Sequence, residues 1–156
     1  MTSYKHTQIG YLILSILCVI LALYIFLAIT ISTQSDDFTP AIIAVMALVL
    51  FILASFSTLT VSIDEKYLRV KFGYGIFAKK FPLAEVASYK TVKNHWYYGW
   101  GIRLWLWPTM WIYNVSGFDA VELTMKNGRI YRIGTDEPQE LATAIAQARG
   151  DGEGNK

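Results

Sequence analysis

Two long runs without a charged residue constrain the fold of this chain more than any other feature. They extend from Ile9 to Ile31 and from Pro40 to Leu59. As helices with a rise of about 1.5 Å per residue, both runs reach across a hydrocarbon core about 30 Å thick. The sequence therefore predicts a transmembrane helical hairpin within residues 1–60, with spans near 9–31 and 40–59 and a short polar linker between them.

The first run has a second interpretation, as part of a cleaved signal peptide. Its apolar stretch is longer than the apolar region of such peptides, and a second run follows shortly after it. Of the 156 residues, 54% are hydrophobic and 17% are charged, which is too apolar for an ordinary soluble domain. We therefore expect both runs to serve as membrane anchors.

The distribution of Lys and Arg predicts how this hairpin crosses the membrane. One basic residue, Lys5, precedes the first run, and the linker has none. Neither run contains Asp, Glu, Lys, Arg or His, which argues against a transporter or a channel lined by charge. By the positive-inside rule, both chain ends are expected in the cytoplasm. The basic residues that follow the second run closely are Lys66, Arg69, Lys71, Lys79 and Lys80.

From Thr58 onward, apolar and polar residues alternate, which is typical of half-buried antiparallel strands. Asn127-Gly128 is a strong hairpin-turn sequence. Together with a hairpin at 102–115, we expect about seven antiparallel strands, enough for a small barrel or two orthogonal sheets. The other predicted strands are 59–63, 68–72, 121–125 and 129–133, with one or two more from 80–83 and 86–92 around Pro82.

One helix is expected to close the domain. Asp136 and Gln139 fit a capping box, with Pro138 in the first turn, and Gly150 ends the helix. Residues 61–150 are thus expected to form one compact cytoplasmic domain, and residues 151–156 a disordered tail. The apolar stripe of the helix consists of Leu141, Ile145 and Ala148.

The stretch His95–Phe118 contains all five tryptophans of the chain. Its aromatic and β-branched residues predict two strands, 102–107 and 111–115, joined by a turn near Pro108. The length of the turn decides which side chains share a face of the hairpin.

Two turns are compatible with the hairpin sequence. If Pro108 and Thr109 alone form the turn, Trp107 pairs with Met110 and the aromatic rings are divided between the two faces. If Met110 also belongs to the turn, Trp107 pairs with Trp111. We prefer this second arrangement, because it gives an aliphatic inner face and an aromatic outer face.

The aromatic face of the hairpin is the first candidate interaction surface. Large amphipathic rings beside an arginine suit a membrane interface or a protein partner, whereas each single ring is also compatible with a place in the core. We expect this surface to contact membrane lipid, a second copy of the chain or another membrane protein. The candidate residues are Trp96, Trp100, Arg103, Trp105, Trp107, Trp111 and Tyr113.

The basic residues after the second run support another hypothesis, contact with anionic lipid headgroups. Anionic lipid attracts each Lys or Arg near the membrane surface by about 1 kcal/mol. The alternative is that these charges only set the topology and keep the strands soluble. The candidate lipid contacts are Arg69, Lys71, Lys79 and Lys80.

No set of residues predicts catalysis or a cofactor. His6, His95 and the single Cys18 do not combine with carboxylates at metal-ligand spacing. Ser116 lacks the setting of a catalytic nucleophile, and the Gly-x-Gly pairs lack the other parts of a nucleotide-binding fingerprint. We therefore expect a protein that is not an enzyme, with no cofactor, no metal and no nucleic-acid partner.

Several short motifs in the C-terminal part are shared with a known family. They are GWGIR (99–103), WIYNVSG (111–117), AVEL (120–123), KNGR (126–129) and RIGTDEP (132–138). In these motifs and their order, the chain resembles small bacterial membrane proteins with two transmembrane helices and a PH-like (pleckstrin-homology-like) domain. The resemblance implies an α+β protein of the bacterial inner membrane, with a seven-stranded antiparallel barrel capped by a C-terminal helix. It does not imply one function, because this fold hosts many.

Overall fold

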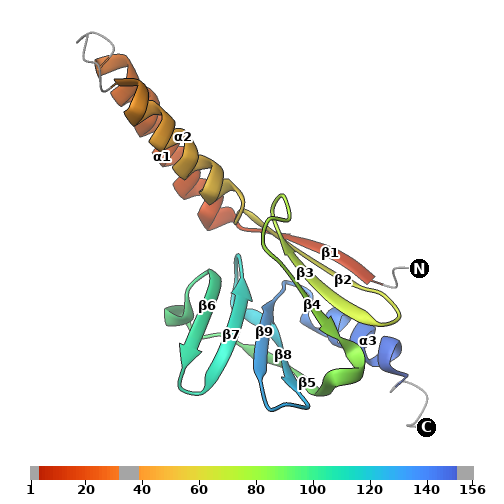
Figure 1. The fold of residues 1–156 in the computed structure, drawn as a ribbon. Coiled ribbons are helices and arrows are strands. Elements are labelled where there is room, and N and C mark those ends of the chain that lie inside the picture. Colours follow the sequence, from red (N-terminus) through yellow and green to blue (C-terminus); the bar gives the residue numbers. More distant parts are fainter. Residues whose placement is uncertain (1–3, 32–38, 151–156) are drawn as a thin grey trace.

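The computed structural model describes residues 4–31 and 39–150. Within them the chain has an α+β fold with three α-helices and two β-sheets. Figure 1 shows the two sheets and the last helix at one end, and a pair of helices that projects from them as a rod. Most of the predicted polar linker and the predicted disordered tail lie outside the described residues, so both stay predictions.

The rod is formed by α1 (Tyr11–Ile31) and α2 (Thr39–Ala54), which pack side by side (Figure 1). Among the described residues, one helical segment, Tyr11–Thr30, is long and apolar enough to cross a membrane. α2 is also apolar, but its 16 residues extend only about 24 Å. The prediction of a membrane-crossing helix is thus met by length and composition in the first run only.

Sheet A lies next to the rod and contains four antiparallel strands in the order β1-β2-β3-β4. The predicted alternation is confirmed in β2 and β3, where every second side chain is buried. β1 is a strand that the sequence did not predict, because its inward positions hold Tyr4, His6 and Gln8 rather than aliphatic residues. The bounds are β1 (Tyr4–Ile9), β2 (Thr58–Ile63), β3 (Tyr67–Phe72) and β4 (Ala78–Pro82).

Sheet B contains five strands in the order β5-β8-β9-β7-β6. Its pairs are antiparallel except that of β7 with β9, which is parallel. Short 3₁₀ turns, η1 (Leu83–Glu85) and η2 (Trp96–Tyr98), precede β5 and β6. The strands are β5 (Val86–Lys93), β6 (Gly101–Leu106), β7 (Thr109–Asn114), β8 (Asp119–Met125) and β9 (Ile130–Gly134).

The prediction of a single seven-stranded antiparallel barrel is wrong, because the strands form two separate sheets. The cause lies in the path of β8, which pairs with β5 instead of continuing beside β7. β9 then fills the place between β8 and β7, and it runs in the same direction as β7. The β6–β7 hairpin therefore forms the outer edge of sheet B.

The main core lies between the sheets and is closed by α3 (Pro138–Arg149), which packs against β2, β5, β8 and η1. Leu141 and Ile145 are fully buried, and Gly150 ends the helix in a left-handed conformation, as predicted. The predicted capping box is wrong: Glu137 is the N-cap residue and its side chain makes no capping hydrogen bond. Asp136 contacts His6 of β1 instead.

The β6–β7 hairpin exists as predicted, but its register differs from both alternatives. Trp107 and Pro108 form the turn, with a cis peptide bond between them, and Trp105 lies opposite Met110. The predicted all-aromatic face is therefore wrong. The rings are divided between the two faces of the sheet, with Trp111 on one and Trp105 on the other, as the two-residue turn predicted.

Candidate functional site

The far end of the β6–β7 hairpin carries an exposed apolar surface. β6 begins near the rod, because it starts opposite Asn114, and the carbonyl group of the next residue, Val115, lies close to Gly10 at the base of α1. β6 then runs away from the rod to the turn (Figure 1). We name the exposed surface at this end the hairpin patch; it consists of Leu104, Leu106, Trp107 and Trp111.

The hairpin patch is exposed because sheet A does not extend over it. Nearer the rod, Ile102 and Tyr113 lie opposite each other and pack into the main core. Two places farther along, Leu104 lies opposite Trp111, and both are exposed. At the end of the hairpin, Trp107 is 89% exposed. Contiguous exposed apolar side chains are uncommon on monomeric proteins and are typical of interaction surfaces.

The opposite face of the hairpin is covered by the chain that leads into β6. Tyr98 of η2 packs with Met110 and Ile112 in a second, smaller core, to which Trp105 adds its ring. The indole N–H of Trp105 donates a hydrogen bond to the carbonyl oxygen of Trp107 (2.8 Å). This hydrogen bond connects the turn to the second core. The second core therefore supports the hairpin from the face opposite to the hairpin patch.

Three charged residues lie side by side on sheet B next to the second core. They are Arg132 of β9, Glu122 of β8 and Lys90 of β5, and Arg132 lies beside Ile112 of the second core. Arg132 Nε donates to Glu122 Oε2 (2.8 Å), and Lys90 Nζ lies 3.2 Å from Glu122 Oε1. The Arg132 guanidinium also lies over the Tyr98 ring, 5.6 Å from its centre. Arg132 thus links the sheet to the segment that supports the hairpin.

The two basic neighbours of Glu122 favour the charged form of its carboxyl group. Burial by itself raises the pKa of Glu122, but hydrogen bonds from Arg132 and Lys90 and the charges of these two groups outweigh it. The pKa of Glu122 therefore lies below its ordinary value. Arg132 Nη1 additionally donates to Asn94 Oδ1 (3.3 Å), which extends the network to the start of the aromatic stretch.

The seven predicted interface residues do not form one surface. Trp96, Arg103, Trp107 and Trp111 are exposed, and Trp100 and Trp105 are half-buried. Tyr113 lies in the main core, where burial raises its pKa. Leu104 and Leu106 were missed, because aliphatic residues in a strand give no signal of exposure. Their exposure follows from the register of the hairpin, which places both on the face that sheet A leaves uncovered.

The free edge of β6 has fewer protecting residues than the β4 and β5 edges. Edge strands avoid unwanted pairing by carrying Lys or Pro. β4 has two lysines and a proline, β5 has two lysines, and β1 has Lys5. β6 has one charged residue, Arg103, whose Nε donates to the carbonyl oxygen of Trp100 (3.1 Å). β6 is therefore an edge strand with one charged residue, and it lies beside the hairpin patch.

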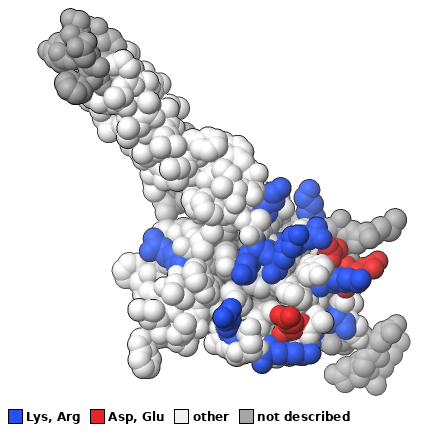
Figure 2. Space-filling model, viewed as in Figure 1, with Lys and Arg blue, Asp and Glu red and all other residues white. Residues whose placement is uncertain are grey.

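The outer face of sheet A carries three of the four predicted lipid-binding residues, Arg69, Lys71 and Lys80, whereas Lys79 lies opposite the buried Val70 at the sheet edge. Lys5, Ser62, Arg69 and Lys80 occupy one row across the four strands. Figure 2 shows the resulting concentration of Lys and Arg below the rod. A groove of about 560 Å³ runs along this face, and Lys71 and Lys79 also line it. Arg69 is already engaged by Asp64, at 2.6 Å.

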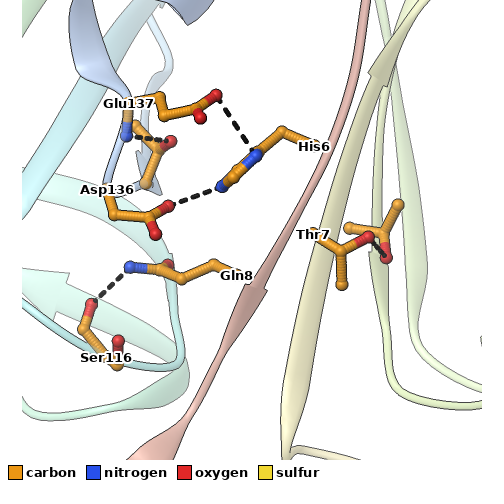
Figure 3. A network of polar contacts seen from close by, with 8 residues as sticks. His6, Thr7, Gln8, Ser116, Asp136 and Glu137 are labelled. Atoms are coloured by element: carbon orange, nitrogen blue, oxygen red, sulfur yellow. Dashed lines mark hydrogen bonds and ion pairs between the residues drawn. The ribbon is translucent and has the colours of Figure 1, made fainter.

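Polar contacts of β1 hold the base of the rod against the rest of the protein (Figure 3). His6 Nε2 lies 2.6 Å from Asp136 Oδ1, and its Nδ1 lies 3.2 Å from Glu137 Oε2. Gln8 Nε2 donates to the carbonyl oxygen of Ser116 (3.1 Å). Because β1 leads directly into α1, these contacts connect the rod to both sheets.

The described residues hold two kinds of chemical group in quantity, apolar and cationic side chains. In residues 4–31 and 39–150, no three side chains of His, Cys, Asp or Glu are placed to share a metal ion. The groups that the fold brings together are apolar side chains at the β6–β7 hairpin and cationic side chains on sheet A. The sequence matches no protein-family model and no curated protein.

Proposed function

We propose that this protein is a non-enzymatic, membrane-anchored module that binds another protein through its β6 edge and hairpin patch. The observation that carries the proposal is the exposure of Leu106 (68%) and Trp107 (89%) next to an open strand edge. Added strands bind through backbone hydrogen bonds, and apolar side chains beside the edge provide specificity. Aromatic residues and Arg dominate the energetics of such interfaces.

The proposal includes two membrane spans, α1 and α2, in a bacterial inner membrane with both chain ends in the cytoplasm. The exposed apolar surface of both helices supports this placement. Gly10 N donates to the carbonyl oxygen of Ser57 (2.7 Å), so the chain enters and leaves the rod at the same level. A sheet of four antiparallel strands, a second sheet and a closing helix also support the proposed PH-like family.

Geometry favours a different protein over a second copy as the partner of the β6 edge. Two identical strands pair antiparallel about a twofold axis perpendicular to the sheet. β6 runs away from the rod, so this axis would turn the rod of the second copy in the opposite direction (Figure 1). Two chains anchored in one membrane cannot adopt that arrangement. We therefore propose an extended segment of another membrane protein.

The substitution Leu104→Lys tests this proposal. It adds a protecting charge to the β6 edge, where Leu104 is exposed, and it should weaken partner binding about tenfold or more. Binding is measured as the yield of a heavier adduct from a photo-crosslinking amino acid at Leu106, in membranes of the native cells. Thr91→Lys, which adds the same charge to the exposed β5 edge, is the matched control and should keep the adduct.

Two results would contradict the proposal. One is an adduct whose yield does not change in the Leu104→Lys protein. The other is an adduct that contains only two copies of this chain, since that would show self-association through the hairpin.

A second candidate function is recognition of anionic lipid by the outer face of sheet A. The specific observation in its favour is the groove lined by Lys5, Lys71, Lys79 and Lys80 close to the rod. Each lysine near an anionic membrane surface contributes about 1 kcal/mol, and salt screens this attraction. The two candidate functions are compatible, because they use different sheets.

The double substitution Lys71→Ala with Lys80→Ala tests the lipid function. In mixed nanodiscs, the preference of the protein for phosphatidylglycerol over phosphatidylcholine should fall about fivefold for each lysine removed. The preference is measured as the ratio of phosphatidylglycerol to phosphatidylcholine that remains bound to the protein after it is purified from the nanodiscs. Lys126→Ala with Arg129→Ala removes the same charge from the β8–β9 turn at the far end of sheet B, and should leave the preference intact. An equal loss in both proteins would show a general charge effect.

A further inference from the structure

The connection between β3 and β4 is an exposed apolar loop beside the rod. Tyr74 is 64% exposed and Ile76 is 59% exposed, and Phe77 follows them. From Phe72 to Ala78 the chain has no charged residue, whereas Lys71 and Lys79 flank this stretch. Neither candidate function described above uses the loop.

The loop contacts the end of α2 through stacked rings. The Tyr74 ring lies parallel to that of Phe51, with centres 5.6 Å and planes 9° apart. The Phe77 ring stacks on Phe56 just after α2, with centres 4.9 Å apart. Phe51 is three residues before Ala54, the end of α2, which corresponds to about 4.5 Å along the helix. The Tyr74 ring therefore lies beside the last turn of α2, next to the exposed apolar side chains of the helix.

Backbone contacts hold the loop in this position. Gly73 N donates to the carbonyl oxygen of Thr58 (2.9 Å), and Phe72 N donates to that of Phe77 (2.9 Å). Gly73 has a φ of 41°, and a Cβ atom there would collide with the carbonyl group of Ser55. The close approach of the loop to α2 thus requires glycine at this position.

We infer that the β3–β4 loop inserts into the membrane interface as a third anchor, and that its binding partner is lipid at the boundary between acyl chains and headgroups. Three observations select lipid as the partner. The exposed rings continue the apolar surface of α2, Tyr and Phe suit this boundary, and the flanking lysines can extend to the headgroups. The inference rests on the proposed membrane insertion of the rod.

This third contact would fix the orientation of the sheets relative to the membrane. The rod alone joins the domain at one place, where α1 and α2 meet sheet A. With the loop inserted as well, tilting of the sheets relative to the membrane is restricted. The basic face of sheet A then lies beside the headgroups, and the hairpin patch points into the cytoplasm, where a partner can reach it.

Spin labelling of the full chain in nanodiscs tests the inference. Cys18 is replaced by serine, Ile76 by cysteine, and a nitroxide is attached; the nanodiscs contain phosphatidylcholine and phosphatidylglycerol in equal amounts. A label at native Cys18, exposed on α1, reports on insertion of the rod. A label at Lys126→Cys in the β8–β9 turn is the reference for a position exposed to water. Accessibility to oxygen, which concentrates in lipid, and to a water-soluble nickel chelate is measured for each label.

The expected result at Ile76 is a loss of nickel accessibility with a gain of oxygen accessibility, relative to the label at Lys126. A label shielded by protein would lose both, and that result would overturn the inference. Nickel accessibility at Ile76 equal to that at Lys126, with Cys18 shielded, would also overturn it and leave the anchored rod intact. If the Cys18 label is accessible to nickel, the proposed membrane insertion fails first.

Discussion

Replacing Arg132 with methionine is expected to destabilise the folded protein by about 3–5 kcal/mol, because a buried ion pair loses one partner. Arg132 and Glu122 lie 2.8 Å apart, and their side chains are only 15% and 9% exposed. After the substitution, Lys90 alone faces the Glu122 carboxylate, from a position that is largely exposed to solvent. Asn94 and Tyr98 lose their contact with the guanidinium at the same time.

Unfolding by urea in detergent micelles, followed by tryptophan fluorescence, measures this effect. All five tryptophans lie between residues 95 and 118, so the signal reports on sheet B and not on the rod. The matched control is Glu122→Leu combined with Arg132→Met, which removes both charges and should recover most of the loss. If the double variant is as unstable as the single one, the effect comes from packing and not from an unpaired charge.

The same variant should show a smaller destabilisation in acid. The pKa of Glu122 is lowered in the folded protein, so its contribution to stability is present above the ordinary glutamate pKa and is lost as the pH falls through the lowered value. In acid, the wild-type protein therefore loses the stabilisation that comes from the Glu122–Arg132 ion pair. The variant has no such ion pair, so the difference in stability between the two proteins becomes smaller. Asp64 also loses its contribution in acid, since hydrogen bonds from the backbone N–H groups of Lys66 and Tyr67 lower its pKa. That loss should be equal in both proteins.

The apolar pattern was sufficient to predict the parts of the fold that depend on burial of alternate residues. It identified β2, β3 and α3, where the buried positions are aliphatic or aromatic and recur at the period of a strand or helix. β1 follows a different rule. Its inward residues are polar, and His6 and Gln8 find their partners at Asp136 and Ser116, more than one hundred residues away. The pattern of apolar residues within one segment cannot predict contacts with residues so far away in the sequence.

The register of the hairpin could not be predicted for a related reason. Side chains alternate with a period of two, so a turn that is one residue longer, as in the preferred arrangement, moves the residues of the second strand to the other face. A two-residue turn that moves by one place changes the pairing but leaves each residue on the same face. Both turns considered from the sequence placed Trp107 in the strand, whereas the structure places it in the turn before Pro108. The candidate site could be predicted only in part for the same reason. The sequence indicated the aromatic stretch, but which of its side chains are exposed depends on the register of the hairpin and on where sheet A ends.

Gly134 at the end of β9 shows how closely the hairpin is fitted to sheet B. A Cβ atom at this position would collide with the side chain of Asn114, which is 2% exposed. Asn114 ends β7, and its Nδ2 donates to the carbonyl oxygen of Gly117 (3.1 Å). The contact lies beside the parallel pairing of β7 with β9 that attaches the hairpin to the sheet. No other part of the described chain pairs in parallel.

The substitution Gly134→Ala is therefore expected to destabilise the protein by about 1–3 kcal/mol, through overpacking against Asn114. Asn114→Ala alone should cost about 1 kcal/mol, because the Gly117 carbonyl loses its donor. In the double variant the added methyl group occupies the space that the amide leaves, so the cost should be less than the sum of the two. Urea unfolding of the four proteins gives this coupling energy. Simple additivity would contradict the contact, whereas a favourable coupling would show that Gly134 and Asn114 pack against each other where β7 joins β9.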